Sequence, residues 1–299
     1  MLKIGIVGKT LSDIYISVLE NHPAYKFVGI FDPSFQFEYP KSISKELIFT
    51  SFAEISSQCD TIVFPSTDKI YFPLVESAVM QSKSIFLHGV YNYTFDELET
   101  LTKLSEEAQE IIQIYHPLIY HDAFLAYRKK CSQPLLINCE LLGQKEMNLI
   151  PYARNQISAI LSLVNANIKK ITPNTISSFS EIPDIIKVRL DFSNGSITDI
   201  HINSIEHKHS HVIKSYNYNS FFEIDFINHQ LNSCDRDDKH IQCFLPAKNT
   251  LHHLLLKQLN EFYYNVLNHT QPVNGIENQI HTQLVINKIK EKLRMCINL

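Results

Sequence analysis

The chain has 299 residues, 44% of them hydrophobic, and carries a net charge of −4 at pH 7 with a pI near 6.4. This length predicts one large domain or two ordinary ones around a sizeable core. The slight acidic balance, with no long run of one sign, argues against a polyanion-binding surface, so we expect no nucleic-acid partner. A compact nucleotide site stays possible.

The cysteines and the apolar runs indicate the compartment. Six cysteines are scattered without a C-x-x-C pair, which is typical of buried thiols in a reducing compartment rather than of a disulfide framework or a zinc ribbon. Because the first strand pattern begins at Leu2, we expect no signal peptide. No apolar run approaches the ~20 residues of a membrane span. We therefore expect a soluble cytoplasmic protein with no membrane partner.

The first 32 residues have the order of a dinucleotide-binding half-unit. Leu2 to Val7 predicts a strand, Gly8 ends it, residues 11–19 have helical apolar spacing, and residues 26–31 predict a second strand that ends in Asp32. In such a unit the glycine turn and the helix N-terminus face a pyrophosphate. The acid accepts hydrogen bonds from both ribose hydroxyls, which favours NAD over NADP.

The glycine pattern of this unit is incomplete. Counted from Gly8, the pattern G-x-G-x-x-G requires glycine at positions 10 and 13, where this chain has Thr10 and Asp13. A side chain at the first of these positions crowds the pyrophosphate, and Asp13 adds negative charge beside it. The sequence therefore predicts the fold more strongly than the cofactor. The alternative for Asp32 is a loop acid without a ligand.

The two halves of the chain have different patterns. Up to about residue 118, strand patterns (60–64, 84–88, 111–115) alternate with helix patterns, one of which begins at a Thr94/Glu97 capping box. This alternation predicts a parallel sheet covered by helices. After that, we expect a strand at 134–143, a helix at 152–164, a hairpin of 186–192 and 197–205 around Asn194-Gly195, strands at 211–227 and 240–245, and helices at 249–268 and 276–294.

The expected fold is thus α/β: a Rossmann-like domain over residues 1–120, then an α+β domain over 121–299 with a mainly antiparallel open sheet. The boundary rests on the change of pattern alone.

Residues 60–90 carry a family pattern. Asp60-Thr-Ile-Val-Phe64 precedes Pro65-Ser66-Thr67, a helix ends in Gln-Ser-Lys-Ser-Ile85, and Phe86-Leu-His-Gly-Val90 follows. This resembles the Gfo/Idh/MocA family (glucose–fructose oxidoreductase, inositol dehydrogenase), which shows D-x-V-x-I-A-T-P, a histidine, A-G-K-H-V and E-K-P. The stretch from Gln258 to Leu293 also resembles the closing helices of that family. The resemblance spans the chain in architecture, and in motif it is specific only over about 1–32 and 60–90.

This resemblance implies an NAD(P)-dependent oxidoreductase that transfers a hydride to or from a sugar, a cyclitol or a similar small polar substrate. It also implies a homo-oligomer formed through the C-terminal sheet. The departures from the family pattern concern its catalytic residues. The E-K-P lysine aligns with Gly89, and the histidine that follows A-T-P in the family aligns with Tyr71. On the helix that carries G-x-x-H-x-x-D in the family, this chain has Asn155 and Ser158.

His88 is the titratable group nearest to the missing lysine. Oxidation of an alcohol by hydride transfer needs a base, and histidine titrates near neutrality. On a strand, however, residue 88 points away from residue 89, so a packed or capping role is the alternative. Other residues that could line the crevice are Tyr93, Tyr115, Tyr120 and His121.

The candidate site is therefore as follows. The cofactor-binding candidates are Gly8, Thr10 and Leu11 at the pyrophosphate, Asp32 at the ribose, and Pro65, Ser66 and Thr67 with the catalytic candidate His88 at the nicotinamide. The substrate-pocket candidates are Tyr91, His116, Tyr152, Arg154 and Asn155.

Two further points bear on function. His207, His209 and His211 would share one face of a strand, but without a spaced fourth ligand they predict a polar sheet face or a subunit contact rather than a physiological metal site. The joint absence of the lysine, the histidine and the aspartate favours a second hypothesis. In this alternative, the chain is a catalytically degenerate member that acts as a nucleotide-binding regulatory or scaffolding subunit.

Overall fold

The computed structural model describes residues 1–34, 43–131, 133–143, 148–177, 183–237, 241–244 and 250–297. The chain forms two compact units, each with its own sheet. Unit 1 comprises Met1–His116 and Thr250–Ile280, and unit 2 comprises Pro117–Asn249 and His281–Leu299. The expected fold class is confirmed: one sheet is parallel and Rossmann-like, and the other is mainly antiparallel.

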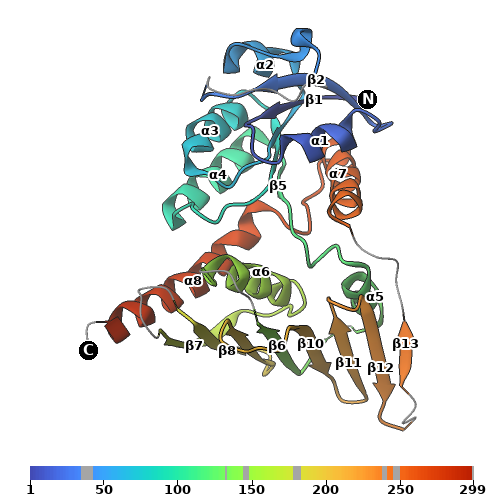
Figure 1. Ribbon diagram of the computed structural model, residues 1–299, viewed down its shortest axis with the longest axis vertical. Helices are drawn as coiled ribbons and strands as arrows, with labels where there is room; N and C mark the ends of the chain where they lie inside the picture. The colour runs from blue at the N-terminus through green and yellow to red at the C-terminus, as the bar shows by residue number, and fades with distance from the viewer. Residues whose placement is uncertain are drawn as a thin grey trace. The chain divides into compact units, whose positions relative to one another are not determined.

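Unit 1 is built on a five-stranded parallel sheet in the order β2-β1-β3-β4-β5 (Figure 1). Its strands are β1 (Leu2–Val7), β2 (Tyr25–Phe31), β3 (Thr61–Phe64), β4 (Ser84–Leu87) and β5 (Ile112–Ile114). Its first helices are α1 (Ser12–Leu19), α2 (Phe52–Gln58), α3 (Phe72–Met80) and α4 (Phe95–Ala108), with short 3₁₀ turns at Lys45–Leu47 (η1) and Lys69–Tyr71 (η2). Every residue of β3 and β4 is buried, which explains their continuous apolar sequence.

Helix α7 (Leu251–Asn268) also belongs to unit 1, although the sequence places residues 121–299 in a single domain. The hydroxyl of Tyr25 donates to the carbonyl of Leu259 over 2.9 Å, and the Gln113 amide donates to the carbonyl of Gln258 over 3.2 Å. The N–H of Ile114 donates to the carbonyl of Asn274 over 2.9 Å. Residues 250–280 therefore cover the edge strand β5 and complete the first core.

Unit 2 is built on an eight-stranded sheet in the order β13-β12-β11-β10-β6-β9-β8-β7. The strands are β6 (Leu136–Leu142), β7 (Ile168–Ile176), β8 (Ile185–Phe192), β9 (Ile197–Asn203), β10 (Ser210–Tyr216), β11 (Ser220–Asp225), β12 (Gln230–Asp235) and β13 (Gln242–Phe244). Its helices are α5 (Asp122–Lys130), α6 (Ile150–Leu161) and the part of α8 (Ile276–Ile297) that begins at His281. Only the β6–β9 pair is parallel among the pairs in the described part of this sheet.

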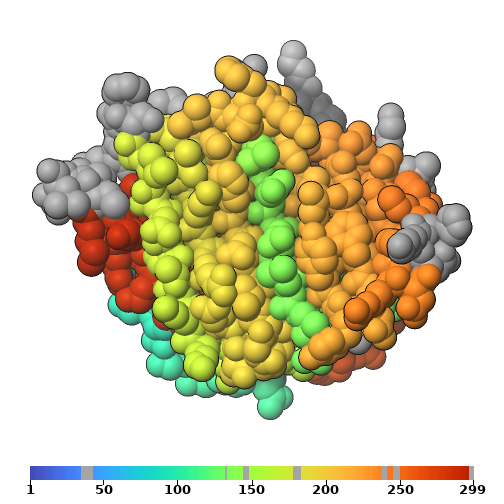
Figure 2. Space-filling model, turned by 90° about the horizontal axis from the view of Figure 1, so that it is seen from below, coloured from blue at the N-terminus to red at the C-terminus, as the bar shows by residue number. Residues whose placement is uncertain are grey.

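The described helices of unit 2 all lie on one face of this sheet, and none of them lies on the other, which we call the open face (Figures 1 and 2). Strand β8 illustrates the alternation, because Val188 and Leu190 are buried while Lys187 and Arg189 are exposed. The turn predicted at Asn194-Gly195 joins β8 to β9, and Gly195 adopts the positive φ of +85° that such a turn needs.

One prediction in this region is wrong. His207 and His209 lie between β9 and β10, and only His211 lies within a strand, so the three histidines do not share a face. The side chain of Asn203 accepts the N–H of Ile205 over 2.9 Å, which ends β9. The strands expected over 211–227 are confirmed as the hairpin β10–β11. Its turn forms because Asn217 Oδ1 accepts the N–H groups of residues 219 and 220.

Candidate functional site

The candidate residues of unit 1 gather at the carboxyl-terminal edge of the parallel sheet. Gly8 follows β1, Asp32 follows β2, Pro65 follows β3, His88 follows β4 and Tyr115 follows β5. The strand order reverses direction between β1 and β3. Ligands of open α/β sheets bind in the crevice outside such a switch point, so the glycine turn and the loop after β3 flank the expected position.

The turn after β1 adopts an unusual backbone. Gly8 has a φ of +116° and donates its N–H to the carbonyl of Phe31 over 2.8 Å. Leu11 has a φ of +56° and a ψ of 10°, the left-handed region that glycine favours, and it is 41% exposed. No side chain caps α1 at Leu11. The N–H of Ser12 donates to the carbonyl of Lys9 over 3.1 Å, and the helix dipole favours an anion at this end of α1.

The buried side chain of Asp32 has an oxygen without a hydrogen-bond donor among the described residues. Its side chain is 1% exposed, and Oδ1 accepts the N–H of Ser34 over 2.8 Å. Among the described residues, Oδ2 has no hydrogen-bond partner. A buried carboxylate oxygen without a donor is unfavourable. Because the hydroxyls of a ribose at the end of β2 would satisfy it, the residues present fit a dinucleotide there.

Tyr71 lies over the glycine turn, and the sequence did not single it out as a site residue. A Cβ added at Gly8 would lie 3.1 Å from Cζ of Tyr71 and 3.2 Å from its hydroxyl oxygen. The phenol accepts a hydrogen bond from the backbone N–H of Lys9. Burial, and to a lesser extent the nearby charge of Asp32, raises the pKa of this phenol to about 12. The alignment of Tyr71 with the family's histidine was the available signal.

The loops after β3 and β4 are tied together. Ser66 Oγ accepts the N–H of Asp68 over 3.1 Å, and the carbonyl of Thr67 accepts the amide of Asn92 over 3.2 Å. A Cβ added at Gly89 would lie 2.9 Å from Cε2 of Tyr91 and 3.0 Å from Cγ2 of Thr67. Tyr91 and Thr67 thus fill the space in which a side chain at position 89 would begin.

His88 is held between two tyrosines. Its Nδ1 lies 2.9 Å from the hydroxyl of Tyr15, and its ring stacks on Tyr115 with centroids 4.8 Å apart. Burial lowers the pKa of His88 to about 4, so the imidazole is neutral at pH 7. Tyr15 is fully buried, and burial raises its pKa well above the usual range. Tyr15 lies within the helical apolar pattern of residues 11–19, and that pattern gives no sign of this contact.

The substrate-pocket candidates are divided between the units. His116 follows β5 in unit 1, is 2% exposed, and donates its backbone N–H to Gln258 Oε1 over 2.7 Å. Tyr152, Arg154 and Asn155 lie on α6 in unit 2. Arg154 is buried there and donates to Gln283 Oε1.

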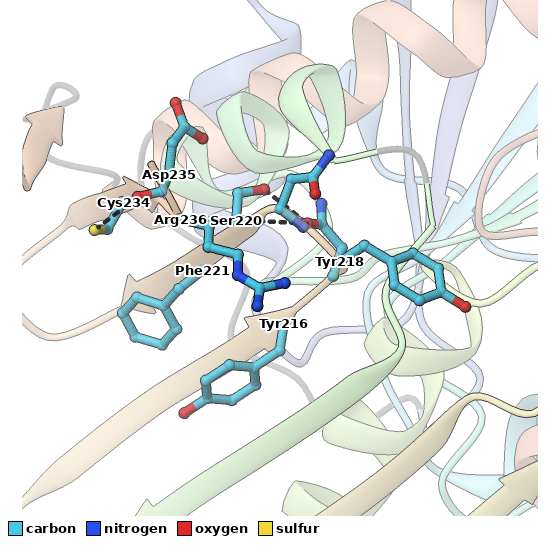
Figure 3. A pocket seen from close by; sticks show the side chains of 9 residues that line it. Tyr216, Tyr218, Ser220, Phe221, Cys234, Asp235 and Arg236 are labelled. Carbon is cyan, nitrogen blue, oxygen red and sulfur yellow. Dashed lines mark hydrogen bonds between the residues drawn. The ribbon is translucent and has the colours of Figure 1, made fainter. Parts of the chain in front are cut away.

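Two open hollows of unit 2 lie elsewhere. One, of about 340 Å³, surrounds the β10–β11 turn (Figure 3), where Tyr218 is 78% exposed. The other, of about 400 Å³, lies on the open face between Thr172 and His201. Neither contains a predicted site residue.

In the described part of the chain, no group of three histidine, cysteine or acidic side chains could hold a metal ion. No helix there combines the length and apolar character needed to cross a bilayer.

Sequence comparison gives no match, because no protein-family model and no curated protein matches the chain. Solved structures do match in fold. UDP-N-acetylglucosamine 3-dehydrogenase GnnA from Acidithiobacillus ferrooxidans superposes with a TM-score of 0.86 at 14% identity, covering 97% of each chain. An oxidoreductase from Agrobacterium radiobacter in complex with NAD+, L-tartaric acid and magnesium gives 0.80 at 10% identity, covering 98% of this chain and 96% of that one.

A third match is levoglucosan dehydrogenase in complex with NADH, with a TM-score of 0.82 at 9% identity, covering 98% of this chain and 97% of that one. The chain therefore has the fold of these dehydrogenases and oxidoreductases over nearly its whole length.

Proposed function

We propose that this chain is an NAD(P)-binding oxidoreductase and a divergent member of the Gfo/Idh/MocA family, acting on a sugar, a cyclitol or a similar small polar substrate. The single observation that carries the proposal is the buried Asp32 carboxylate at the end of β2, whose Oδ2 has no partner among the described residues. Solved structures of the same fold bind NAD+ or NADH, and the fold is otherwise shared by many activities.

The cofactor would contact three parts of unit 1. Gly8, Thr10 and Leu11 would lie by the pyrophosphate, and Asp32 would accept hydrogen bonds from the adenosine ribose, which favours NAD over NADP. Pro65, Ser66 and Thr67 would flank the nicotinamide. When bound, the cofactor supplies or accepts the hydride.

The proton must come from the chain or from water, since the cofactor does not supply it. His88 is the proposed acid–base group at this edge, acting while its Nδ1 stays bonded to Tyr15. Its pKa of about 4 leaves it mostly neutral at pH 7, so any rate it controls should fall only under strongly acidic conditions. Tyr91 and His116 in unit 1 are the proposed contacts of the substrate. The roles expected for Tyr152, Arg154 and Asn155 on α6 of unit 2 stay predictions.

The test is a titration of the purified chain with NADH and NADPH, followed by NADH fluorescence and by calorimetry. Binding at micromolar concentrations, tighter for NADH, is the expected result. Absence of binding of either nucleotide up to about 1 mM, an affinity of only some 4 kcal/mol, would contradict the proposal.

A second function, a nucleotide-binding regulatory or scaffolding subunit without catalysis, is favoured by one specific observation. The space beside Gly89 is filled by Tyr91 and Thr67, so no amine stands there. This function predicts NADH binding without turnover of any sugar or cyclitol. Oxidation of one such substrate, lost in His88→Ala with the NADH affinity retained, would exclude it.

A further inference from the structure

The phenol of Tyr71 occupies the place where the glycine turn would receive a phosphate. The turn after β1 offers its backbone N–H groups to a pyrophosphate when a dinucleotide binds to this fold. Here the Lys9 N–H is already engaged by the hydroxyl of Tyr71. The same ring lies against Gly8, since a Cβ there would come within 3.1 to 3.3 Å of its Cζ, hydroxyl oxygen and Cε1.

The position of the ring also bears on the ribose end of the site. Tyr71 is 6% exposed and packs edge-on against Phe64, the last residue of β3, with centroids 6.4 Å apart. It is close enough to Asp32 for that carboxylate to influence the phenol. The ring therefore lies between the glycine turn and Asp32. A bound dinucleotide would extend through this space, from its pyrophosphate at the turn to its ribose at the acid.

The backbone below the ring is held in place by hydrogen bonds and an ion pair. The N–H of Tyr71 donates to the carbonyl of Asp68 over 3.3 Å, and Asp68 Oδ1 caps the turn η2 through the N–H of Ile70 over 3.1 Å. Lys69, beside it, pairs with Glu97 at 2.9 Å. A rotation about the Cα–Cβ bond would remove the ring from Gly8 without disturbing these contacts.

We propose that Tyr71 is a latch on the nucleotide site, with a phenol that stands in for a phosphate oxygen on the Lys9 N–H and must swing away before a pyrophosphate binds. This inference rests on the proposed function and adds its regulation. It makes Tyr71 a determinant of nucleotide affinity: the ligand-free turn is held closed by this phenol, and only ligands with a pyrophosphate have to displace it.

The test compares the wild type with Tyr71→Phe and Tyr71→Ala, using NADH, ADP and adenosine as probes. Loss of one neutral hydrogen bond should tighten NADH and ADP binding by about fivefold in Tyr71→Phe, and Tyr71→Ala should bind at least as tightly. Adenosine, which has no pyrophosphate, should bind all three proteins equally. The control is Tyr25→Phe, which also removes one hydrogen bond made by the hydroxyl of a buried tyrosine. Tyr25 is the first residue of β2, at the end of the strand opposite to Asp32.

Hydrogen exchange of the Lys9 amide gives a second readout without ligand, and it should quicken in Tyr71→Phe but not in Tyr25→Phe. A latch so tight that only the Tyr71 variants bind NADH would also support the inference. Equal or weaker binding of NADH and ADP in Tyr71→Phe, with the wild type binding normally, would overturn the latch and leave the proposed function standing. Failure of every variant to bind any probe would overturn both.

Discussion

Replacing Asp32 by asparagine tests the nucleotide site most directly. The asparagine keeps Oδ1 for the N–H of Ser34 and removes the charge from the second position. Because Oδ1 already has this partner, one oxygen is left for a ribose hydroxyl. A hydrogen bond to a charged group contributes about 1.5 to 3 kcal/mol, so the Kd for NADH should rise roughly 10- to 150-fold.

The same change should alter the choice between nucleotides. A carboxylate repels the 2′-phosphate of NADPH, and asparagine does not, so the preference for NADH should shrink or reverse. The assay is a parallel fluorescence titration with both nucleotides. The control is Asp60→Asn, which also removes one negative charge but lies before β3, where its Oδ2 accepts the N–H of Lys3 over 2.8 Å. Unchanged NADH affinity in Asp32→Asn would refute the assignment of the ribose to this side chain.

Three further predictions concern stability and assembly. Leu11→Gly should stabilise the chain by about 0.5 to 1 kcal/mol, because it removes a left-handed leucine that is 41% exposed; a lower thermal midpoint would contradict this. Burial lowers the pKa of His211 to about 4, below its ordinary value of 6.5. The unfolded chain therefore takes up this proton first, and stability should fall as the pH drops from 6.5 towards 4. Thermal midpoints across that range should fall less steeply in His211→Gln, and identical slopes would rule out this origin. The predicted homo-oligomer should use the open face, so Arg189→Glu at its exposed surface should lower the mass measured by light scattering. A wild-type mass of 34.6 kDa, that of one chain, would contradict the prediction.

The sequence predicts best the features of the fold that depend on local signals. The Thr94/Glu97 capping box begins α4 as predicted, with both reciprocal hydrogen bonds formed. The order of strand, glycine turn, helix, strand and acid is also confirmed for β1, α1 and β2. In each case the signal and the structure lie within a few residues of each other, so no distant contact was needed to decide them.

The sequence fails to predict features that depend on contacts between distant parts of the chain. The position of Tyr71 over Gly8 depends on the packing of two strands, and the pairing of Tyr15 with His88 spans 73 positions. Leu11 in a left-handed conformation was not predictable, because leucine disfavours that region. The attachment of α7 to unit 1 depends on single hydrogen bonds, such as that from Tyr25 to Leu259, which leave no periodic pattern in the sequence.

The split composition of unit 1 has a consequence for biosynthesis. The edge strand β5 is complete at Ile114, but the segment that closes its outer side, around Asn274 and Gly275, is made after all of residues 117–249. At about 5 to 20 residues per second, the nascent chain would wait roughly 8 to 30 s with an unpaired strand edge. The first unit would thus mature only after residues 117–249 of the second have been synthesised, and chaperone contacts during translation should concentrate on this strand.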